Sequence, residues 1–152
     1  MSRRKRYYIA YGSNLSEEQM AFRCPEAKPV GMAVLKDMKL VFRIHATIEP
    51  CPGRVVPVLI WEISEQDERS LDRYEGWPRY YRKEEMQITM TNFRGLTPRK
   101  VTAMVYIMTE GREITPPMKG YYDVIEKGYI RYGFNKYQLE LTMKEAREHE
   151  LS

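Results

Sequence analysis

The sequence is poor in the residues that build metal sites and nucleophile sites, because its 152 residues include only two cysteines and two histidines. Cys24 and Cys51 form no CxxC pair, and neither stands near His45 or His149 in the sequence. A structural zinc site needs four Cys or His ligands at tight spacing. We therefore expect no metal and expect free thiols in a reducing cytoplasm; a disulfide between the two cysteines is the alternative, which no sequence feature supports.

Other common patterns are also missing. The chain has no GxGxxG and no GxxxxGK[ST] motif, so a nucleotide cofactor is not expected. No stretch approaches the roughly 18 uninterrupted apolar residues of a membrane helix. The basic start of the sequence is followed by no apolar segment, so it does not read as a secretory signal. These absences predict a cytoplasmic protein with no cofactor and no membrane partner.

The chain also has no large excess of positive or negative residues, because its formal net charge is only +4. Four basic residues are clustered at the start, as Arg3, Arg4, Lys5 and Arg6; the other 21 basic residues equal the 21 acidic ones in number. A nucleic-acid reader normally shows a basic face or stripe. We therefore expect residues 1–6 to be a flexible basic tail and expect no nucleic-acid partner. Docking of this tail to an anionic surface is the alternative.

The composition, with 43% hydrophobic and 30% charged residues, is typical of a folded chain, and the length predicts one domain over residues 1–152. Apolar alternation and turn residues predict about six strands that cluster in the middle of the chain, four helices, and loops over 48–54 and 92–100. This is an α+β class, in which six strands can close a small mixed barrel with flanking α-helices. The predicted strands are 7–11, 28–35, 38–44, 55–63, 80–91 and 101–108, and the predicted helices are 17–22, 65–74, 118–132 and 136–148.

The first candidate for chemistry is the turn after the first strand. A glycine there allows a sharp turn, and Ser16 can cap the helix that follows. Successive free backbone N–H groups in such a turn can hold an anion. The alternative is an ordinary strand-to-helix turn. The residues of this turn are Tyr11, Gly12, Ser13, Asn14 and Leu15.

The second candidate is Glu75, at the last turn of a helix that stops at Gly76. A carboxylate there faces the negative end of the helix dipole, which raises its pKa. Between the aromatic side chains of Tyr74 and Trp77, such a group can be tuned toward neutral pH as a proton shuttle. The alternative is a solvated helix end.

The third candidate is a set of tyrosines near the end of the chain, which includes Tyr121, Tyr122 and Tyr129 at a spacing typical of one helix face. Core packing is the alternative to a site wall with a donor hydroxyl. Arg82 begins a strand and can present its guanidinium to a carboxylate, although a surface ion pair is the more common use. No Ser-His-Asp pattern is present, so any chemistry must use a carboxylate, tyrosines and backbone dipoles.

Together these segments resemble the γ-glutamylcyclotransferase-like (AIG2-like) family over nearly the whole chain. The resemblance rests on the order and separation of short motifs. These are Tyr-Gly-Ser-Asn-Leu at 11–15, Val-Pro-Val-Leu-Ile-Trp-Glu-Ile at 56–63, Leu-Asp-Arg-Tyr-Glu-Gly at 71–76, Tyr81-Arg82, and Pro117 with Tyr121, Gly128, Gly133 and Tyr137.

The resemblance implies a small mixed β-barrel and an enzyme that cyclises a γ-glutamyl group to 5-oxoproline, releasing an amine or amino acid, without metal or cofactor. It also implies that the backbone of residues 11–14 holds the γ-glutamyl group. Glu75 falls on the family's acid/base glutamate, and Tyr121 falls on a tyrosine that lines the substrate pocket.

One departure from the family pattern concerns specificity. Members often have Gly where this chain has Val58, and a side chain there could reshape the pocket. The sequence leaves open whether the leaving group is an amino acid, an amine, part of glutathione or an antibiotic precursor, and it leaves the oligomeric state open. A non-catalytic protein that retains the γ-glutamyl pocket is the alternative function.

Overall fold

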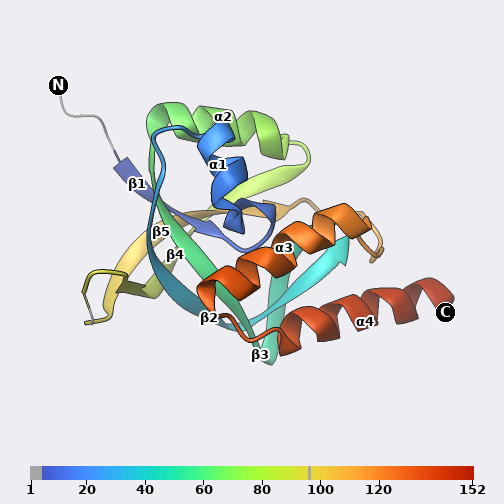
Figure 1. The fold of residues 1–152 in the computed structure, drawn as a ribbon. Helices are drawn as coiled ribbons and strands as arrows, with labels where there is room; N and C mark the ends of the chain where they lie inside the picture. Colours follow the sequence, from blue (N-terminus) through green and yellow to red (C-terminus); the bar gives the residue numbers. More distant parts are fainter. Residues whose placement is uncertain (1–4, 96) are drawn as a thin grey trace.

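Five strands close a barrel in the computed structural model, which describes residues 5–95 and 97–152. Around the barrel the strands follow the order β1 (Lys5–Ala10), β3 (His45–Ser64), β2 (Lys28–Arg43), β4 (Tyr81–Asn92) and β5 (Arg99–Met108). All neighbours are antiparallel except β1 and β5, which pair in parallel and close the barrel (Figure 1). The predicted α+β class with a small mixed barrel is confirmed.

Four α-helices flank the barrel in the described part of the chain. A 3-10 turn η1 (Ser13–Leu15) leads into α1 (Glu17–Arg23), which lies beside α2 (Glu65–Glu75) at one end of the barrel (Figure 1). Helices α3 (Lys119–Tyr132) and α4 (Tyr137–Leu151) close the chain. α4 is fixed to β2 by a hydrogen bond from the Thr142 hydroxyl to the Leu40 carbonyl. The predicted helices are confirmed to within a few residues at each end.

The β2–β3 hairpin corrects two predictions. The two strands expected over 28–35 and 38–44 are one strand, β2, in which Asp37 forms a bulge with a φ of 57°. The loop predicted over 48–54 is wrong, because residues 48–50 pair with β2 and the segment belongs to β3. The proline and glycine residues that suggested a loop lie opposite the bulge, where the Asp37 carboxylate accepts a hydrogen bond from the Gly53 N–H at 2.9 Å.

The basic tail is shorter than predicted. Lys5 and Arg6 belong to β1, and the Arg6 guanidinium binds the carboxylates of Glu68 on α2 and Glu85 on β4. The prediction of a flexible tail is therefore wrong for these two residues. Arg3 and Arg4 lie outside the described residues.

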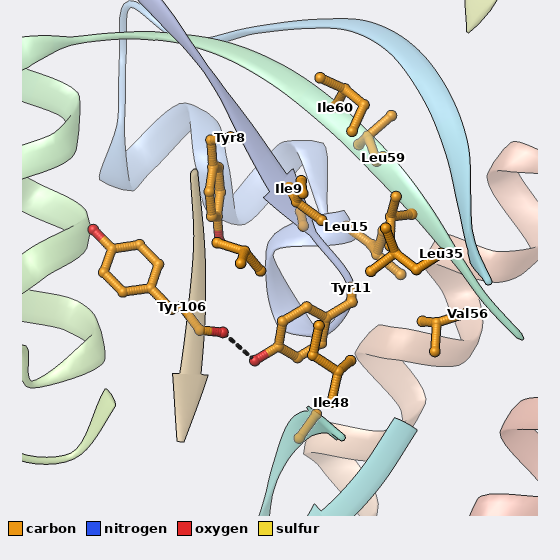
Figure 2. Close-up of a cluster of buried hydrophobic side chains, with 14 of the residues drawn as sticks. Tyr8, Ile9, Tyr11, Leu15, Leu35, Ile48, Val56, Leu59, Ile60 and Tyr106 are labelled. Carbon is orange, nitrogen blue, oxygen red and sulfur yellow. Dashed lines mark hydrogen bonds between the residues drawn. The ribbon is translucent and has the colours of Figure 1, made fainter. Parts of the chain in front are cut away.

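A continuous apolar core fills the barrel and the space beneath the helices. Figure 2 shows part of it, where aliphatic side chains of β1, β2 and β3 surround Tyr11. The Tyr11 hydroxyl donates to the Tyr106 backbone carbonyl at 2.7 Å, so this buried phenol has its polar atom satisfied. Each fully buried aliphatic side chain of this kind adds roughly 1.5–3 kcal/mol of transfer free energy.

The helices are not membrane spans. Within residues 5–95 and 97–152, none is both long enough and apolar enough to cross a bilayer.

Candidate active site

Helix α2 positions Glu75 because both of its ends are fixed. At the N-terminus the Ser64 hydroxyl accepts from the Asp67 N–H while the Asp67 carboxylate accepts from the Ser64 N–H, which completes a capping box. At the C-terminus Gly76 takes a left-handed conformation with a φ of 69°. The Trp77 N–H then donates to the Asp72 carbonyl, so the chain leaves the helix directly after Glu75.

The turn between β1 and η1 lies across from this helix end. Within the described residues, none of the backbone N–H groups of residues 12–14 donates a hydrogen bond, whereas the Gly12 and Ser13 carbonyls accept from Leu15 and Ser16. These N–H groups are therefore available to an acceptor that enters from outside. A Cβ at Gly12 would lie 3.4 Å from the Ala46 Cβ and 3.5 Å from the Tyr121 hydroxyl, so the backbone here passes close to both.

A cavity of about 140 Å³ separates the two elements. A cavity of about 150 Å³ is known to hold a benzene molecule, so this one suits a small head group rather than a whole dipeptide. Backbone and side chains from β1, η1, β3, α2, β4 and α3 line it. The lining residues are Tyr8, Tyr11, Gly12, Ser13, Asn14, His45, Ala46, Tyr74, Glu75, Tyr80, Tyr81 and Tyr121.

Glu75 is the acidic residue among them, and burial raises the pKa of its carboxyl to about 7. The positive charge of Arg23 opposes this rise in pKa without cancelling it. The carboxyl makes no hydrogen bond and no ion pair with any described residue. The helix end was the expected cause of a raised pKa; burial is the cause found in the structure. A carboxyl of this kind exchanges protons readily near neutral pH.

The tyrosine hydroxyls around Glu75 differ in whether they still have a proton to donate to a ligand. Tyr11 and Tyr81 donate their protons to the backbone carbonyls of Tyr106 and Ala46. Tyr121 instead accepts from the Ala46 N–H at 3.0 Å, and its own proton is donated to no described residue. Burial raises the pKa of Tyr121, so the phenol stays protonated at neutral pH. It is therefore a hydrogen-bond donor that an occupant of the cavity can use.

The polar side chains of the β1–η1 turn are already hydrogen-bonded to neighbouring residues. The Ser13 hydroxyl lies 2.9 Å from the Tyr74 hydroxyl. The Asn14 carboxamide donates to the Tyr8 hydroxyl and accepts from the Arg23 guanidinium, which also stacks on the Tyr74 ring at 3.4 Å. These bonds hold the turn in place and leave its backbone, rather than its side chains, to face a ligand.

Most of the predicted site residues come together, and two do not. Tyr11, Gly12, Ser13, Asn14, Glu75 and Tyr121 all line the cavity. Leu15 does not: it is fully buried and packs against Gly128 of α3, as part of the core in Figure 2. Arg82 is exposed and pairs with Glu84, and it is not among the residues that line the cavity. Val58 is fully buried and is not among the lining residues, so it does not reshape the cavity by projecting into it.

Sequence reasoning missed Tyr8, His45 and Tyr80, which also line the cavity. Tyr8 lies on β1, three residues before the turn, and begins a run of three buried residues at the end of that strand, so no alternation in the sequence separated it from the core. His45 begins β3 directly after the positive-φ residue Ile44. No local motif marks His45, because it reaches the site only through the closure of the β2–β3 hairpin.

Comparisons with known proteins agree on one family. The family model described as gamma-glutamyl cyclotransferase, AIG2-like, matches residues 8–129. Gamma-glutamylcyclotransferases of Mus musculus and Homo sapiens are 33% and 30% identical to the chain, in each case over 93% of this chain and 80% of the relative. A solved gamma-glutamyl cyclotransferase superposes with a TM-score of 0.73 at 29% identity, covering 91% of this chain and 86% of the other.

A solved structure of lower sequence identity has the same fold. YkqA from Bacillus subtilis superposes with a TM-score of 0.74 at 20% identity, covering 95% of this chain and 55% of that one. At this identity the likeness concerns the fold alone.

Proposed function

The chain belongs to the gamma-glutamyl cyclotransferase, AIG2-like family, and from that premise we propose that it converts the γ-glutamyl group of a small γ-glutamyl compound to 5-oxoproline. The amine or amino acid attached to the γ-carbonyl is released. One observation carries the proposal. A carboxyl with a pKa of about 7 and no hydrogen-bond partner among the described residues lines a small cavity opposite unoccupied backbone N–H groups.

The substrate supplies its own nucleophile, so positioning provides much of the rate. In the bound substrate the α-nitrogen must lie against the γ-carbonyl carbon. The free N–H groups of residues 12–14 bind the α-carboxylate or the γ-carbonyl oxygen. The Tyr121 hydroxyl adds a donor on the same side, close to Gly12.

Glu75 moves the protons. Its carboxylate takes a proton from the α-ammonium, and the freed lone pair attacks the γ-carbonyl carbon to form the new C–N bond. The carbonyl electrons move to oxygen and return when the bond to the leaving nitrogen breaks. Protonated Glu75 gives its proton to that nitrogen. The ring nitrogen then gives its second proton to Glu75, which passes it to the released amine to form the ammonium. The α-nitrogen has lost two protons, the leaving group has gained two, and the enzyme ends unchanged.

The raised pKa of the buried Glu75 carboxyl favours both of these proton transfers. A carboxyl with an ordinary pKa would hold its proton too weakly to protonate a leaving amine, and a much higher pKa would leave it already protonated. A pKa near the working pH favours both transfers.

Product analysis tests the proposal. The protein is incubated with γ-glutamyl-alanine, γ-glutamyl-ε-lysine and glutathione, and 5-oxoproline is measured by mass spectrometry. We expect at least one compound to yield 5-oxoproline and Glu75→Gln to lower kcat by at least about 10²-fold. Glu65→Gln is the matched control, because Glu65 is an exposed residue at the other end of the same helix.

Two outcomes would contradict the proposal. If Glu75→Gln turns over at the wild-type rate, Glu75 is not the acid/base. If every compound is bound but recovered unchanged, the chain is a binding protein that retains the pocket.

A further inference from the structure

Three side chains behind the Glu75 cavity form a chain of hydrogen bonds that begins at a positive charge. The Arg23 guanidinium donates to the oxygen of the Asn14 carboxamide, and the nitrogen of that carboxamide donates to the Tyr8 hydroxyl at 2.8 Å. Arg23 is partly buried and forms no ion pair within residues 5–95 and 97–152. Asn14 and Tyr8 are each only 3% exposed, so each of their polar atoms must face a suitable partner.

The chemistry of the three groups fixes the direction of this chain. A guanidinium only donates hydrogen bonds, so Arg23 must face the oxygen of the Asn14 carboxamide. The nitrogen of the carboxamide then faces Tyr8, and the Tyr8 hydroxyl must accept. With the carboxamide turned over, two donors would meet at Arg23. Arg23 therefore prevents the Tyr8 hydroxyl from donating its proton to Asn14.

The Tyr8 proton has no acceptor in the described part of the chain, and Tyr8 lines the cavity beside Glu75. Its ring is held edge-on against the ring of Tyr106, with the ring centroids 5.9 Å apart (Figure 2). Burial, reinforced by the charge of Glu75, raises the pKa of Tyr8, so the phenol stays protonated at neutral pH. Tyr8 thus presents to the cavity a donor whose orientation is set before any ligand enters.

We propose that the Tyr8 hydroxyl binds an oxygen of the γ-glutamyl group during the reaction, and that Asn14 and Arg23 are positioning residues that direct its proton into the cavity. The proposal rests on the cyclotransferase function proposed above. The γ-glutamyl group offers its α-carboxylate and its γ-carbonyl oxygen, and the carbonyl oxygen gains negative charge as the new C–N bond forms. A donor that is already oriented stabilises such a charge without reorganisation at that step.

The variant Asn14→Asp reverses the hydrogen bond at Tyr8. A carboxylate has nearly the shape of the carboxamide and still accepts from Arg23, but its second oxygen is also an acceptor. The Tyr8 hydroxyl then donates to this carboxylate, and its proton no longer enters the cavity. Tyr8→Phe removes the same proton by another route. If the proposal holds, the effects of the two changes are not additive.

The substrate is whichever of the three γ-glutamyl compounds named above is cyclised fastest. Rates are compared at the pH of maximum rate of each variant, so that changes in the pKa of Glu75 do not enter. We expect Tyr8→Phe and Asn14→Asp each to lower kcat/KM about tenfold or more. The double variant should be no slower than the slower single variant, whereas two independent effects would multiply to about a hundredfold loss.

The Arg23 variants test what sets the direction of the chain. Arg23→Gln supplies an amide that can donate or accept, so the Asn14 carboxamide can turn over, and we expect kcat/KM to fall several-fold. Arg23→Lys remains a donor only and should recover most of that loss. Tyr7→Phe is the matched control, because Tyr7 precedes Tyr8 on β1, does not line the cavity and accepts from Arg99. Thermal unfolding checks that each variant folds.

The results separate failure of this proposal from failure of the function. If the substrate is cyclised and Tyr8→Phe keeps the wild-type kcat/KM, or the two single effects multiply, the proposal is overturned while the function stands. A Tyr8→Phe profile that keeps its maximum rate and only moves its acid limb also overturns it, because Tyr8 would then donate to Glu75. If Tyr8→Phe does not fold, equal rates for Arg23→Gln and Arg23→Lys overturn the proposal, and a faster Arg23→Lys supports it.

If none of the three compounds is cyclised, the function fails, and calorimetric titration of the same compounds decides the role of Tyr8. Binding that is weaker in both Tyr8→Phe and Asn14→Asp than in the wild type supports the proposed donor. Equal affinities, or no binding at all, overturn it.

Discussion

The two ends of α2 place a carboxyl group in opposite situations. At the N-terminus the Asp67 side chain, 1% exposed, accepts hydrogen bonds from the backbone N–H groups of Ser64 and Glu26. At the C-terminus the carboxyl of Glu75 is desolvated and makes no hydrogen bond with a described residue, and its pKa rises to about 7. A desolvated carboxylate with partners stabilises a fold, and one without partners costs stability. A helix that satisfies one such group and not the other makes the second a candidate for the proposed chemistry.

The largest expected effect concerns pH and activity at the Glu75 end. As the proposed base, Glu75 must be ionised in the free enzyme, and its pKa of about 7 would set the acid limb of the rate profile. We expect kcat/KM to fall about tenfold per pH unit below about pH 7. Initial rates from pH 5 to pH 9 measure this. An acid limb with a midpoint near 4.5 would mean that the carboxyl of Glu75 is not desolvated in the working enzyme.

The next effect concerns stability at the Asp67 end. Asp67→Ala removes one half of the capping box and the acceptor for two backbone N–H groups. We expect the free energy of unfolding to fall by about 2 kcal/mol. Urea denaturation measures it, and Glu75→Gln at pH 8 is the paired variant. A loss for Glu75→Gln as large as that for Asp67→Ala would remove the contrast between the two ends.

A smaller effect links pH to stability. The pKa of Glu75 is raised in the folded chain from about 4.5 to about 7, so the folded state binds more protons within that range. The free energy of unfolding therefore decreases as pH rises from about 4.5 to about 7, and Glu75 adds no further change above that. Glu75→Gln removes this contribution. We expect the variant to be more stable than the wild type at pH 8 and the difference to vanish near pH 4.5, as followed by thermal unfolding. A difference that is constant with pH would contradict the link.

The smallest effect concerns the residue that ends the helix. Gly76 has a φ of 69°, and a Cβ there would lie 3.1 Å from the Tyr80 Cβ. We expect Gly76→Ala to destabilise the fold by about 1 kcal/mol. Gly120→Ala is the control of opposite sign, because Gly120 lies within α3 and a Cβ there meets no atom within 4 Å. Equal effects of the two changes would show that backbone conformation at Gly76 does not matter.

Local signals were sufficient for the helices and for the position of Glu75. Ser64, Gly76 and Gly133 mark helix ends by capping chemistry that depends only on neighbouring residues. The strands were harder to predict. Pro50, Pro52 and Gly53 indicate a loop on local grounds, yet β2 lies alongside and incorporates the segment into β3 around the bulge at Asp37. Pairing with a distant strand overrode the local preference.

The sequence by itself determined the class of fold, the family, and the pairing of a turn at residues 11–14 with a glutamate at a helix end. Only the tertiary structure decided the rest. It placed Arg82 and Leu15 away from the cavity and brought His45 and Tyr80 into its lining. It also made burial the cause of the raised Glu75 pKa. The physical reason is that helix ends and turns depend on near neighbours, whereas desolvation and side-chain contact depend on which strands close the barrel.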